Sequence, residues 1–196
     1  MCLMNELIHI NDKISYIPAS EDPLSSEVVF IESHSHTYIY DVGRNKCVAD
    51  YILDIHNPVI ILSHFHGDHI ENISRIGTPT LYVSKQTSKY THFGELILEN
   101  KYICDGDINL RIFPLPSSHA KGCLGLEVNG EFAFLGDAVY GMSHKAPGEE
   151  YNYQLLQNEL QILKTLLADK IYLSHRFSSP TTKKGVLSFL EKHLSK

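Results

Sequence analysis

The sequence predicts an α/β fold, and three features of the chain support this assignment. Short apolar runs of strand length occur in both halves, for example at residues 59–62 and 131–135. Each half ends in a segment whose apolar residues recur at helical spacing, as at residues 181–194. Polar motifs stand directly after several apolar runs, where an open sheet usually places its functional site. With 196 residues, of which 43% are hydrophobic, the chain is expected to form one domain over residues 1–196.

The N-terminal part of the chain is expected to form antiparallel strands and then a helix. The predicted elements are a hairpin at residues 6–17, a loop at 18–26, strands at 28–31 and 37–42, a helix at 45–56 and a strand at 59–62. Asn11-Asp12-Lys13 separates the two apolar pieces of the hairpin. Val48, Ile52 and Ile55 have helical spacing, and Asn57-Pro58 ends that helix before the next strand.

The remaining chain continues to alternate between strands and helices. The predicted elements are a helix from near residue 67, a strand at 81–83, a helix within 85–91, a strand at 110–115, a hairpin of 124–128 and 131–135, a helix at 149–168, a strand at 171–173 and a helix at 181–194. Asn129-Gly130 is the dipeptide that a type I′ turn requires. Leu156, Leu160, Leu163 and Leu167 form one apolar stripe and are expected in the core.

Three histidines and an aspartate lie within six positions after the strand at 59–62, namely His64, His66, Asp68 and His69. Side chains alternate along a strand, so His64 and His66 point the same way. A helix beginning near Gly67 places Asp68 and His69 on its first turn, facing the same cavity. Imidazole and carboxylate groups are preferred ligands of zinc, manganese and iron(II). The stretch therefore predicts a metal site.

The pattern H-x-H-x-D-H resembles the signature of the metallo-β-lactamase superfamily. Three further pieces follow in that family's order, each after an apolar run: Ser117-Ser118-His119, Gly136-Asp137 and Ser174-His175. Residues 38–43 resemble the family's first motif, so the resemblance extends from about residue 28 to the C-terminus. It implies a four-layer αββα sandwich of two mixed β-sheets flanked by helices, with the metals at one sheet edge.

The resemblance also implies a complete set of ligands for two metal ions. One ion would be held by His64, His66 and His119, the other by Asp68, His69 and His175, with Asp137 bridging. The expected ions are Zn²⁺, with iron and manganese also compatible with these ligands. Two such ions hold a shared hydroxide, and Asp68 is expected to orient it or accept its proton. The implied enzyme is a dinuclear metal-dependent hydrolase that attacks a carbonyl.

The substrate class stays open between a thioester, a lactone and another ester or amide, because the resemblance is to glyoxalase II-like and acyl-homoserine lactonase-like members. Tyr140 lies three residues after Asp137, where the lactonases also have a tyrosine. Its hydroxyl is predicted either to donate to the developing oxyanion or to pack with its ring on the pocket wall. Two alternative functions are a phosphodiesterase or nuclease of the same superfamily and a low-turnover metal-binding sensor.

Several other polar residues are expected near the site without being ligands. Asp41 is predicted to orient ligands, and His36 to lie in a loop or to line the pocket. The Ser33–His36 stretch has two histidines, including His34, but lacks the Asp-His pair that would complete a metal motif. His92 is predicted to lie on a surface loop, with substrate contact as the alternative.

Composition restricts the partners and the cellular location. A formal net charge of −6 with dispersed lysines argues against nucleic acid and favours a small-molecule substrate. The longest aliphatic run is far shorter than the ~20 residues that span a bilayer, and the N-terminus resembles no export signal. A cytoplasmic location without membrane association is therefore predicted, with the four scattered cysteines reduced. The sequence leaves the oligomeric state open.

Overall fold

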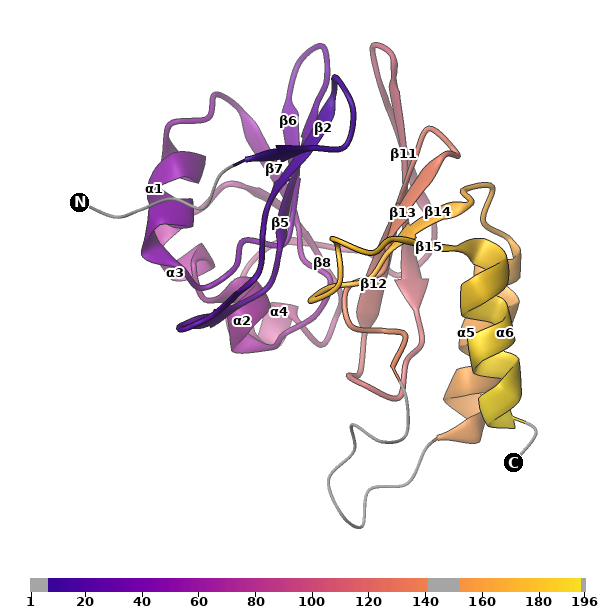
Figure 1. The fold of residues 1–196 in the computed structure, drawn as a ribbon. Helices are drawn as coiled ribbons and strands as arrows, with labels where there is room; N and C mark the ends of the chain where they lie inside the picture. The colour runs from indigo at the N-terminus through magenta and orange to yellow at the C-terminus, as the bar shows by residue number, and fades with distance from the viewer. Residues whose placement is uncertain (1–6, 141–151, 195–196) are drawn as a thin grey trace.

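Two mixed β-sheets lie face to face at the centre of the computed structural model, and helices cover both outer surfaces (Figure 1). The structure describes residues 7–140 and 152–194. The colour gradient in Figure 1 separates the layers along the chain, since the first sheet and its helices precede the second sheet and its helices. This order of layers confirms the predicted αββα sandwich.

The first sheet is antiparallel at one side and parallel at the other. Its strands among the described residues are, in spatial order, β1 (Ile8–His9), β2 (Ile14–Ile17), β5 (Val28–Glu32), β6 (Thr37–Tyr40), β7 (Pro58–Ile61), β8 (Thr80–Val83) and β9 (Glu95–Leu96). Pairing is parallel from β6 to β9, so crossovers are required, and α1 (Lys46–Leu53), α2 (Gly67–Ile70) and α3 (Ile73–Ile76) supply the first two. The carboxyl ends of β6 and β7 therefore lie at the same edge.

The second sheet carries the remaining site segments. Its described strands are, in spatial order, β10 (Lys101–Asp105), β11 (Ile108–Leu115), β12 (Cys123–Val128), β13 (Phe132–Phe134), β14 (Lys170–Tyr172) and β15 (Thr181–Thr182). The crossover between parallel β13 and β14 includes α5 (Tyr153–Lys164), and α6 (Lys183–Leu194) packs beside it. Three small elements complete the fold: β3 (Ser20–Glu21), β4 (Leu24–Ser25) and α4 (Ser88–Thr91).

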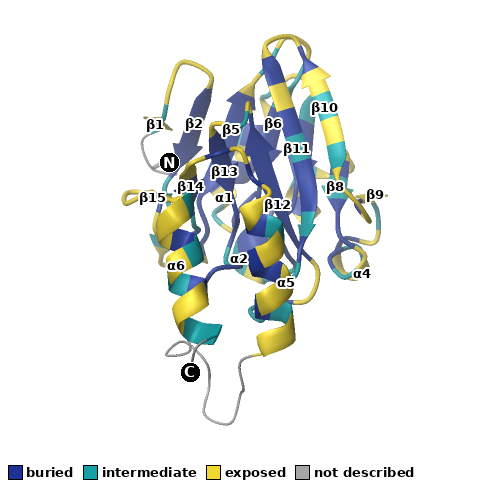
Figure 2. Ribbon diagram, turned by 90° about the vertical axis from the view of Figure 1, so that its right-hand side faces the viewer, coloured by how far each residue is buried: buried dark blue, intermediate teal, exposed yellow. Residues whose placement is uncertain are grey.

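Three apolar clusters fill the spaces between the four layers. The central cluster joins the inner faces of the two sheets, with Ile61 and Phe134 among its buried members. A second joins the first sheet to α1 and α3, and a third joins the second sheet to α5 and α6. Figure 2 shows the consequence: the strands are mostly dark blue, whereas α5 and α6 are yellow on their outer faces.

Two predicted segments differ in detail from the observed elements. The expected loop at residues 18–26 contains the short hairpin of β3 and β4. The single helix expected after residue 67 is divided into α2 and α3 at Asn72, whose buried side chain donates to the backbone oxygens of Val42 and Asn45. These two hydrogen bonds attach the chain between α2 and α3 to the segment after β6. An uninterrupted helix facing solvent would not form them.

The helix expected at residues 149–168 is shorter than predicted at its C-terminus. It ends at Lys164, with Thr165 as its cap, and residues 149–151 lie outside the described part of the chain. Leu167 is consequently not in the core, because it follows the helix and its side chain is 81% exposed. Leu166 is buried instead. The prediction for Leu167 was wrong because the helical period was continued past the end of the helix.

The hairpin turn predicted at Asn129-Gly130 is present in the structure. Asn129 and Gly130 both have positive φ, at 53° and 64°, which confirms the predicted hairpin turn.

Cys104 and Cys123 are free thiols, but Cys47 in α1 is disulfide-bonded, so the expectation of four reduced cysteines is wrong. Disulfides persist mainly in oxidising compartments. The cytoplasmic location stays a prediction, and the disulfide bond of Cys47 argues against it. No helix in the described ranges is sufficiently long and apolar to span a membrane.

Candidate metal centre

The seven predicted ligands converge at one end of the sandwich, beyond the carboxyl ends of strands in both sheets. His64 and His66 follow β7, and Asp68 and His69 lie in α2. The other three come from the second sheet: His119 follows β11, Asp137 follows β13 and His175 follows β14. The chain thus brings together residues separated by more than one hundred positions.

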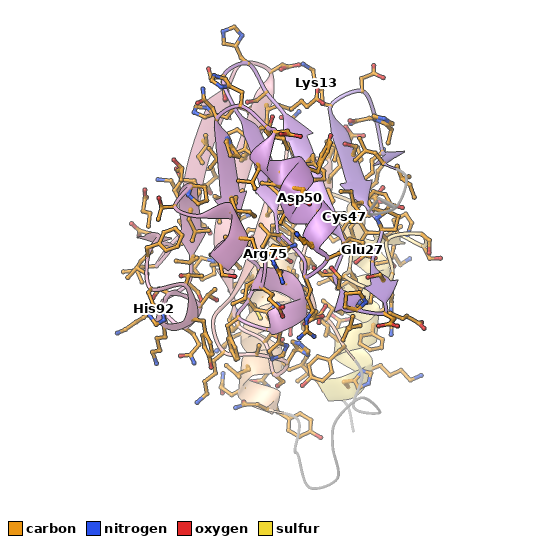
Figure 3. The ribbon with its side chains drawn as sticks, turned by 90° about the vertical axis from the view of Figure 1, so that its left-hand side faces the viewer. Lys13, Glu27, Cys47, Asp50, Arg75 and His92 are labelled. Atoms are coloured by element: carbon orange, nitrogen blue, oxygen red, sulfur yellow. The ribbon has the colours of Figure 1, made fainter. Side chains whose placement is uncertain are left out.

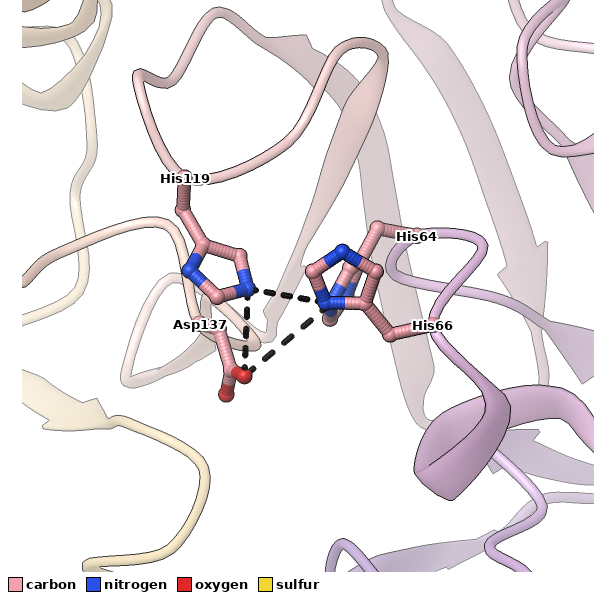
Figure 4. Close-up of side chains that lie close together, drawn as sticks. All are labelled: His64, His66, His119 and Asp137. Atoms are coloured by element: carbon pink, nitrogen blue, oxygen red, sulfur yellow. Dashed lines mark hydrogen bonds and ion pairs between the residues drawn. The ribbon is translucent and has the colours of Figure 1, made fainter. Parts of the chain in front are cut away.

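The first group consists of His64, His66, His119 and Asp137, whose potential ligand atoms all lie within 4.8 Å of one another. Nε2 of His119 is 3.1 Å from Nδ1 of His66 and 3.4 Å from Oδ2 of Asp137 (Figure 4). Nε2 of His64 is 4.0 Å from the same carboxylate oxygen. Three imidazoles and one carboxylate therefore surround a single point.

The second group consists of Asp68, His69, His175 and again Asp137. Oδ2 of Asp68 is 3.2 Å from Nε2 of His175 and 3.5 Å from Nε2 of His69. Oδ2 of Asp137 is 3.4 Å from Nε2 of His69 and 3.9 Å from Nε2 of His175. Asp137 is the residue that both groups share, as expected of a bridging carboxylate.

Unpartnered polar atoms at this point test whether the residues suit a metal. Nε2 of His64, Nε2 of His69 and Oδ1 of Asp137 are buried and make no hydrogen bond within the described structure. Leaving such groups unpaired is costly, about 1–3 kcal/mol each, more for charged groups. Burial, followed by the neighbouring His69 ring, holds the pKa of His64 well below its usual value, so His64 is neutral. Imidazole nitrogens and carboxylates are the donor types that divalent transition metals prefer, and metal binding releases any proton that the imidazole nitrogens carry, so the residues fit such ions.

Asp41 and Ser63 orient His64 and His69 through contacts with the Nδ1 atoms of their rings. The Ser63 N–H donates to Oδ1 of Asp41 at 2.7 Å, and Oδ2 of Asp41 lies 2.8 Å from Nδ1 of His69. The Ser63 hydroxyl also bonds to Asp41 and lies 2.9 Å from Nδ1 of His64. Because Nδ1 of each ring has a partner, Nε2 is the atom directed at the centre. The predicted orienting role of Asp41 is confirmed by these contacts.

A close approach at Gly136 and two hydrogen bonds of Ser117 position the segments from the second sheet. Gly136 has a φ of 57°, and a Cβ atom there would lie 2.8 Å from Cβ of Ser63. A glycine is therefore required where the two sheets meet beside Asp137. Ser117 ties the loop of His119 to the chain after Asp137, because its hydroxyl accepts from the His119 N–H and donates to the oxygen of Ala138.

Glu27 is a buried carboxylate that the sequence analysis did not single out. Its Oε2 accepts from the N–H of His175 at 2.7 Å, and its Oε1 accepts from the N–H of Phe177 at 3.3 Å. His175 has a left-handed φ of 62°, a conformation that costs energy for a histidine, and the Glu27 carboxylate secures this turn. The one sequence feature that could have indicated this role of Glu27 is an acidic residue immediately before the buried strand β5.

Three histidines considered in the sequence analysis, and the nearby Cys123, can now be placed. Cys123 is buried, donates to the oxygen of Ala120 and belongs to neither group; burial raises the pKa of its thiol above its usual value. His36 binds Asp105 through Nδ1 at 3.0 Å and does not line the site, and His34 is exposed. His92 ends α4 at the periphery and belongs to neither metal group (Figure 3).

Tyr140 lines a cavity of about 260 Å³ together with His119, Asp137 and His175. Its ring meets that of His119 edge to face, with centroids 5.3 Å apart. Tyr140 therefore lies beside His119 at the wall of this cavity, and the role of its hydroxyl stays a prediction.

Comparison with known proteins establishes the fold. No family model and no curated protein matches the sequence. A metallo-β-lactamase from Pontibacter korlensis superposes with a TM-score of 0.68 over 97% of both chains at 16% identity. A metallo-β-lactamase superfamily protein from Sulfolobus tokodaii gives 0.63 over 93% of this chain and 85% of its own, at 18% identity. A sec-alkylsulfatase, Pisa1 from Pseudomonas sp., gives 0.72 over 98% of this chain and 41% of its own, at 12% identity. The chain has the metallo-β-lactamase fold.

Proposed function

We propose that this protein is a dinuclear metal-dependent hydrolase that attacks the carbonyl group of a small thioester, lactone or other ester or amide. The observation that carries the proposal is the Asp137 carboxylate, whose Oδ2 lies between two groups of metal-suited side chains. Its Oδ1 and the Nε2 atoms of His64 and His69 are buried and make no hydrogen bond within the described structure, which favours metal ions as their missing contacts.

In this proposal His64, His66 and His119 hold one ion, Asp68, His69 and His175 hold the other, and Asp137 contacts both. Zn²⁺ is the expected metal, because it suits histidine and carboxylate ligands, although Fe and Mn fit the same donors. Bound ions of this kind lower the pKa of a coordinated water from about 15.7 toward 7 and polarise the oxygen under attack.

The chain's own residues would then orient the substrate and move protons. Asp68 faces His175 and His69 through Oδ2, and its carboxylate remains ionised near neutral pH. Although burial raises the pKa of Asp68, the hydrogen bond from His175 and the charge of His69 lower it to about 2. Asp68 is thus available to accept a proton from the nucleophile. Tyr140 is proposed to donate a hydrogen bond from its hydroxyl to the carbonyl oxygen as negative charge develops there.

The cavity favours a small substrate over a polymer. Its volume of about 260 Å³ accommodates a small acyl group. The net charge of −6 further disfavours nucleic acid, which needs clustered basic residues. A small-molecule substrate, without a nucleic-acid or membrane partner, is therefore proposed.

Hydrolysis assays with matched chromogenic substrates test the proposal. Metal-loaded protein is expected to turn over a p-nitrophenyl ester, a thioester or a lactone, and Asp137→Ala to reduce turnover to background. Preferential turnover of bis-p-nitrophenyl phosphate would favour the phosphodiesterase alternative instead. A sulfate ester belongs in the same panel, because one protein of similar fold is an alkylsulfatase. Metal binding without turnover of any substrate would indicate a sensor.

A further inference from the structure

A second cavity adjoins the candidate metal centre on the side of α6. It has a volume of about 230 Å³ and shares three lining residues with the metal-site cavity, Val139, Leu173 and Arg176. Because these residues border both spaces, the two cavities are adjacent, and together they are called the crevice, which extends from Asp137 toward Phe189 of α6. A substrate held at the metal centre could extend along this crevice.

The walls of the second cavity are largely apolar. Val139 and Val186 are buried there, and Leu173 and Phe189 are partly buried beside them. The hydroxyl-bearing residues Ser179 and Thr181 lie at its border. A short hydrocarbon segment would therefore replace water along these walls, which the hydrophobic effect favours.

Arg176 is the exception to this apolar lining. It is exposed, it follows His175 directly, and it is the one lysine or arginine among the described residues that line either cavity. Its guanidinium group makes no hydrogen bond or ion pair with any residue in the described part of the chain.

The other three arginines of the chain are paired with glutamates. Arg44 and Arg75 contact Glu71 at 2.7 and 3.7 Å, and Arg111 contacts Glu127 at 3.5 Å. Arg176 is exposed beside the candidate active site and has no carboxylate partner among the described residues, so its guanidinium group is available to bind an anionic ligand. A ligand carboxylate suits it, because the planar guanidinium forms two parallel hydrogen bonds to that group.

We propose that the crevice is a substrate subsite and that Arg176 binds a carboxylate on the substrate. The substrate class is then an ester, thioester or lactone of a short apolar acid that carries one free carboxylate. This inference rests on the proposed hydrolase function, which supplies the reaction but not the charge preference.

Substrates that differ in one terminal group test the charge preference. The parent protein is expected to hydrolyse the p-nitrophenyl monoester of glutaric acid with a higher kcat/KM than p-nitrophenyl pentanoate, which lacks the charge. Arg176→Met should reduce the ratio of the two kcat/KM values by roughly 10- to 100-fold, the usual range for a charge-assisted hydrogen bond. Lys192→Met removes one positive charge from the exposed face of α6 and should leave the ratio unchanged.

A binding measurement separates failure of this inference from failure of the hydrolase proposal. Glutarate binding is followed by NMR titration of metal-loaded and chelator-treated protein, with neutral glutaramide as the control ligand. Arg176→Met should weaken glutarate binding at least tenfold in both preparations, whereas Lys192→Met should not. If no ester is hydrolysed but Arg176→Met still weakens glutarate, the subsite stands and the reaction is wrong. Equal glutarate affinity for the parent and Arg176→Met would overturn the subsite, whatever the ester assays give.

Discussion

Tyr140 is the residue that we propose as hydrogen-bond donor to the reacting carbonyl, and its ring packs edge to face against that of His119 at the cavity wall. Tyr140→Phe keeps the ring and deletes the hydroxyl, so the variant isolates hydrogen-bond donation. We expect kcat/KM for lactones and thioesters to fall by about 10²–10³, the usual cost of a lost oxyanion donor. An unchanged kcat/KM on every substrate of the parent would leave Tyr140 with a packing role alone.

Glu27 acts on the second metal group without touching it, because it holds the backbone N–H groups of His175 and Phe177. Glu27→Gln keeps the size but can no longer present two acceptors, and it removes a buried negative charge. We expect the ion of the second group to bind roughly 10- to 100-fold more weakly, as is usual when the support of a ligand is lost. The ion of the first group should be retained.

Metal titration of Glu27→Gln, with the number of bound ions measured per chain, tests whether the second ion alone is bound more weakly. Glu21→Gln is the matched control, because Glu21 is exposed and lines the same neighbouring cavity as Glu27. Equal weakening of both ions would indicate a general loss of structure and would contradict a specific role in positioning His175.

Glu159 of α5 is a buried acid with no partner at its Oε1 atom. Burial raises the pKa of its carboxyl to about 9, so the folded protein keeps this group protonated while the unfolded chain releases the proton above about pH 4.5. The folded state therefore binds more protons between these values, and its stability falls as pH rises, by at most about 1.4 kcal/mol per pH unit.

Glu159→Gln keeps the shape and removes the ionisation, so its stability relative to the parent should increase with pH. Urea unfolding of both proteins at pH 6 and pH 8.5 measures this difference. A difference that does not change between the two pH values would show that Glu159 is ionised in the folded protein.

At the scale of elements, the turns at the far end of the sandwich are joined by Asp105. Its carboxylate accepts from the Ser33 hydroxyl at 2.6 Å and from the Ser35 N–H at 3.1 Å, and it contacts His36 at 3.0 Å. These contacts connect the turn between β5 and β6 with the turn between β10 and β11, one from each sheet. The hydrogen bond from Ser33, and those from His36 and Ser35, hold the pKa of Asp105 well below its usual value.

Asp105→Asn is therefore expected to lower the free energy of unfolding at neutral pH. A depressed carboxyl pKa contributes stability above the unfolded value of 3.8, and this contribution is lost as pH falls toward the folded value. The deficit of the variant should accordingly shrink between pH 7 and pH 3. Asp107→Asn, which affects one exposed contact with Lys13, is the control. An equal deficit at both pH values would exclude a role for the Asp105 charge.

Local patterns account for the elements that were predicted correctly. The type I′ turn depends on two adjacent residues, Asn129 and Gly130, and the strand ends are marked by polar residues after apolar runs. The failures come from contacts across the fold. The break between α2 and α3 depends on Asn72 reaching the chain after β6, and the exposure of Leu167 depends on where α5 ends.

At the scale of the whole molecule, the same distinction applies to the candidate centre. The seven predicted ligands could be found from sequence because each directly follows a strand or lies in the signature stretch, and strand ends of one sheet edge converge. Glu27 could not be found in this way, because it lies 148 positions before His175 and acts on backbone atoms. The binding partner of His36 is Asp105, 69 positions away, and was equally invisible in the sequence.

The central claim is that two overlapping groups of side chains hold two metal ions with Asp137 between them. Elemental analysis of protein expressed with excess metal and then dialysed tests this claim directly. We predict close to two transition-metal ions per chain in the parent. One ion or none per chain in correctly folded protein would contradict the dinuclear centre.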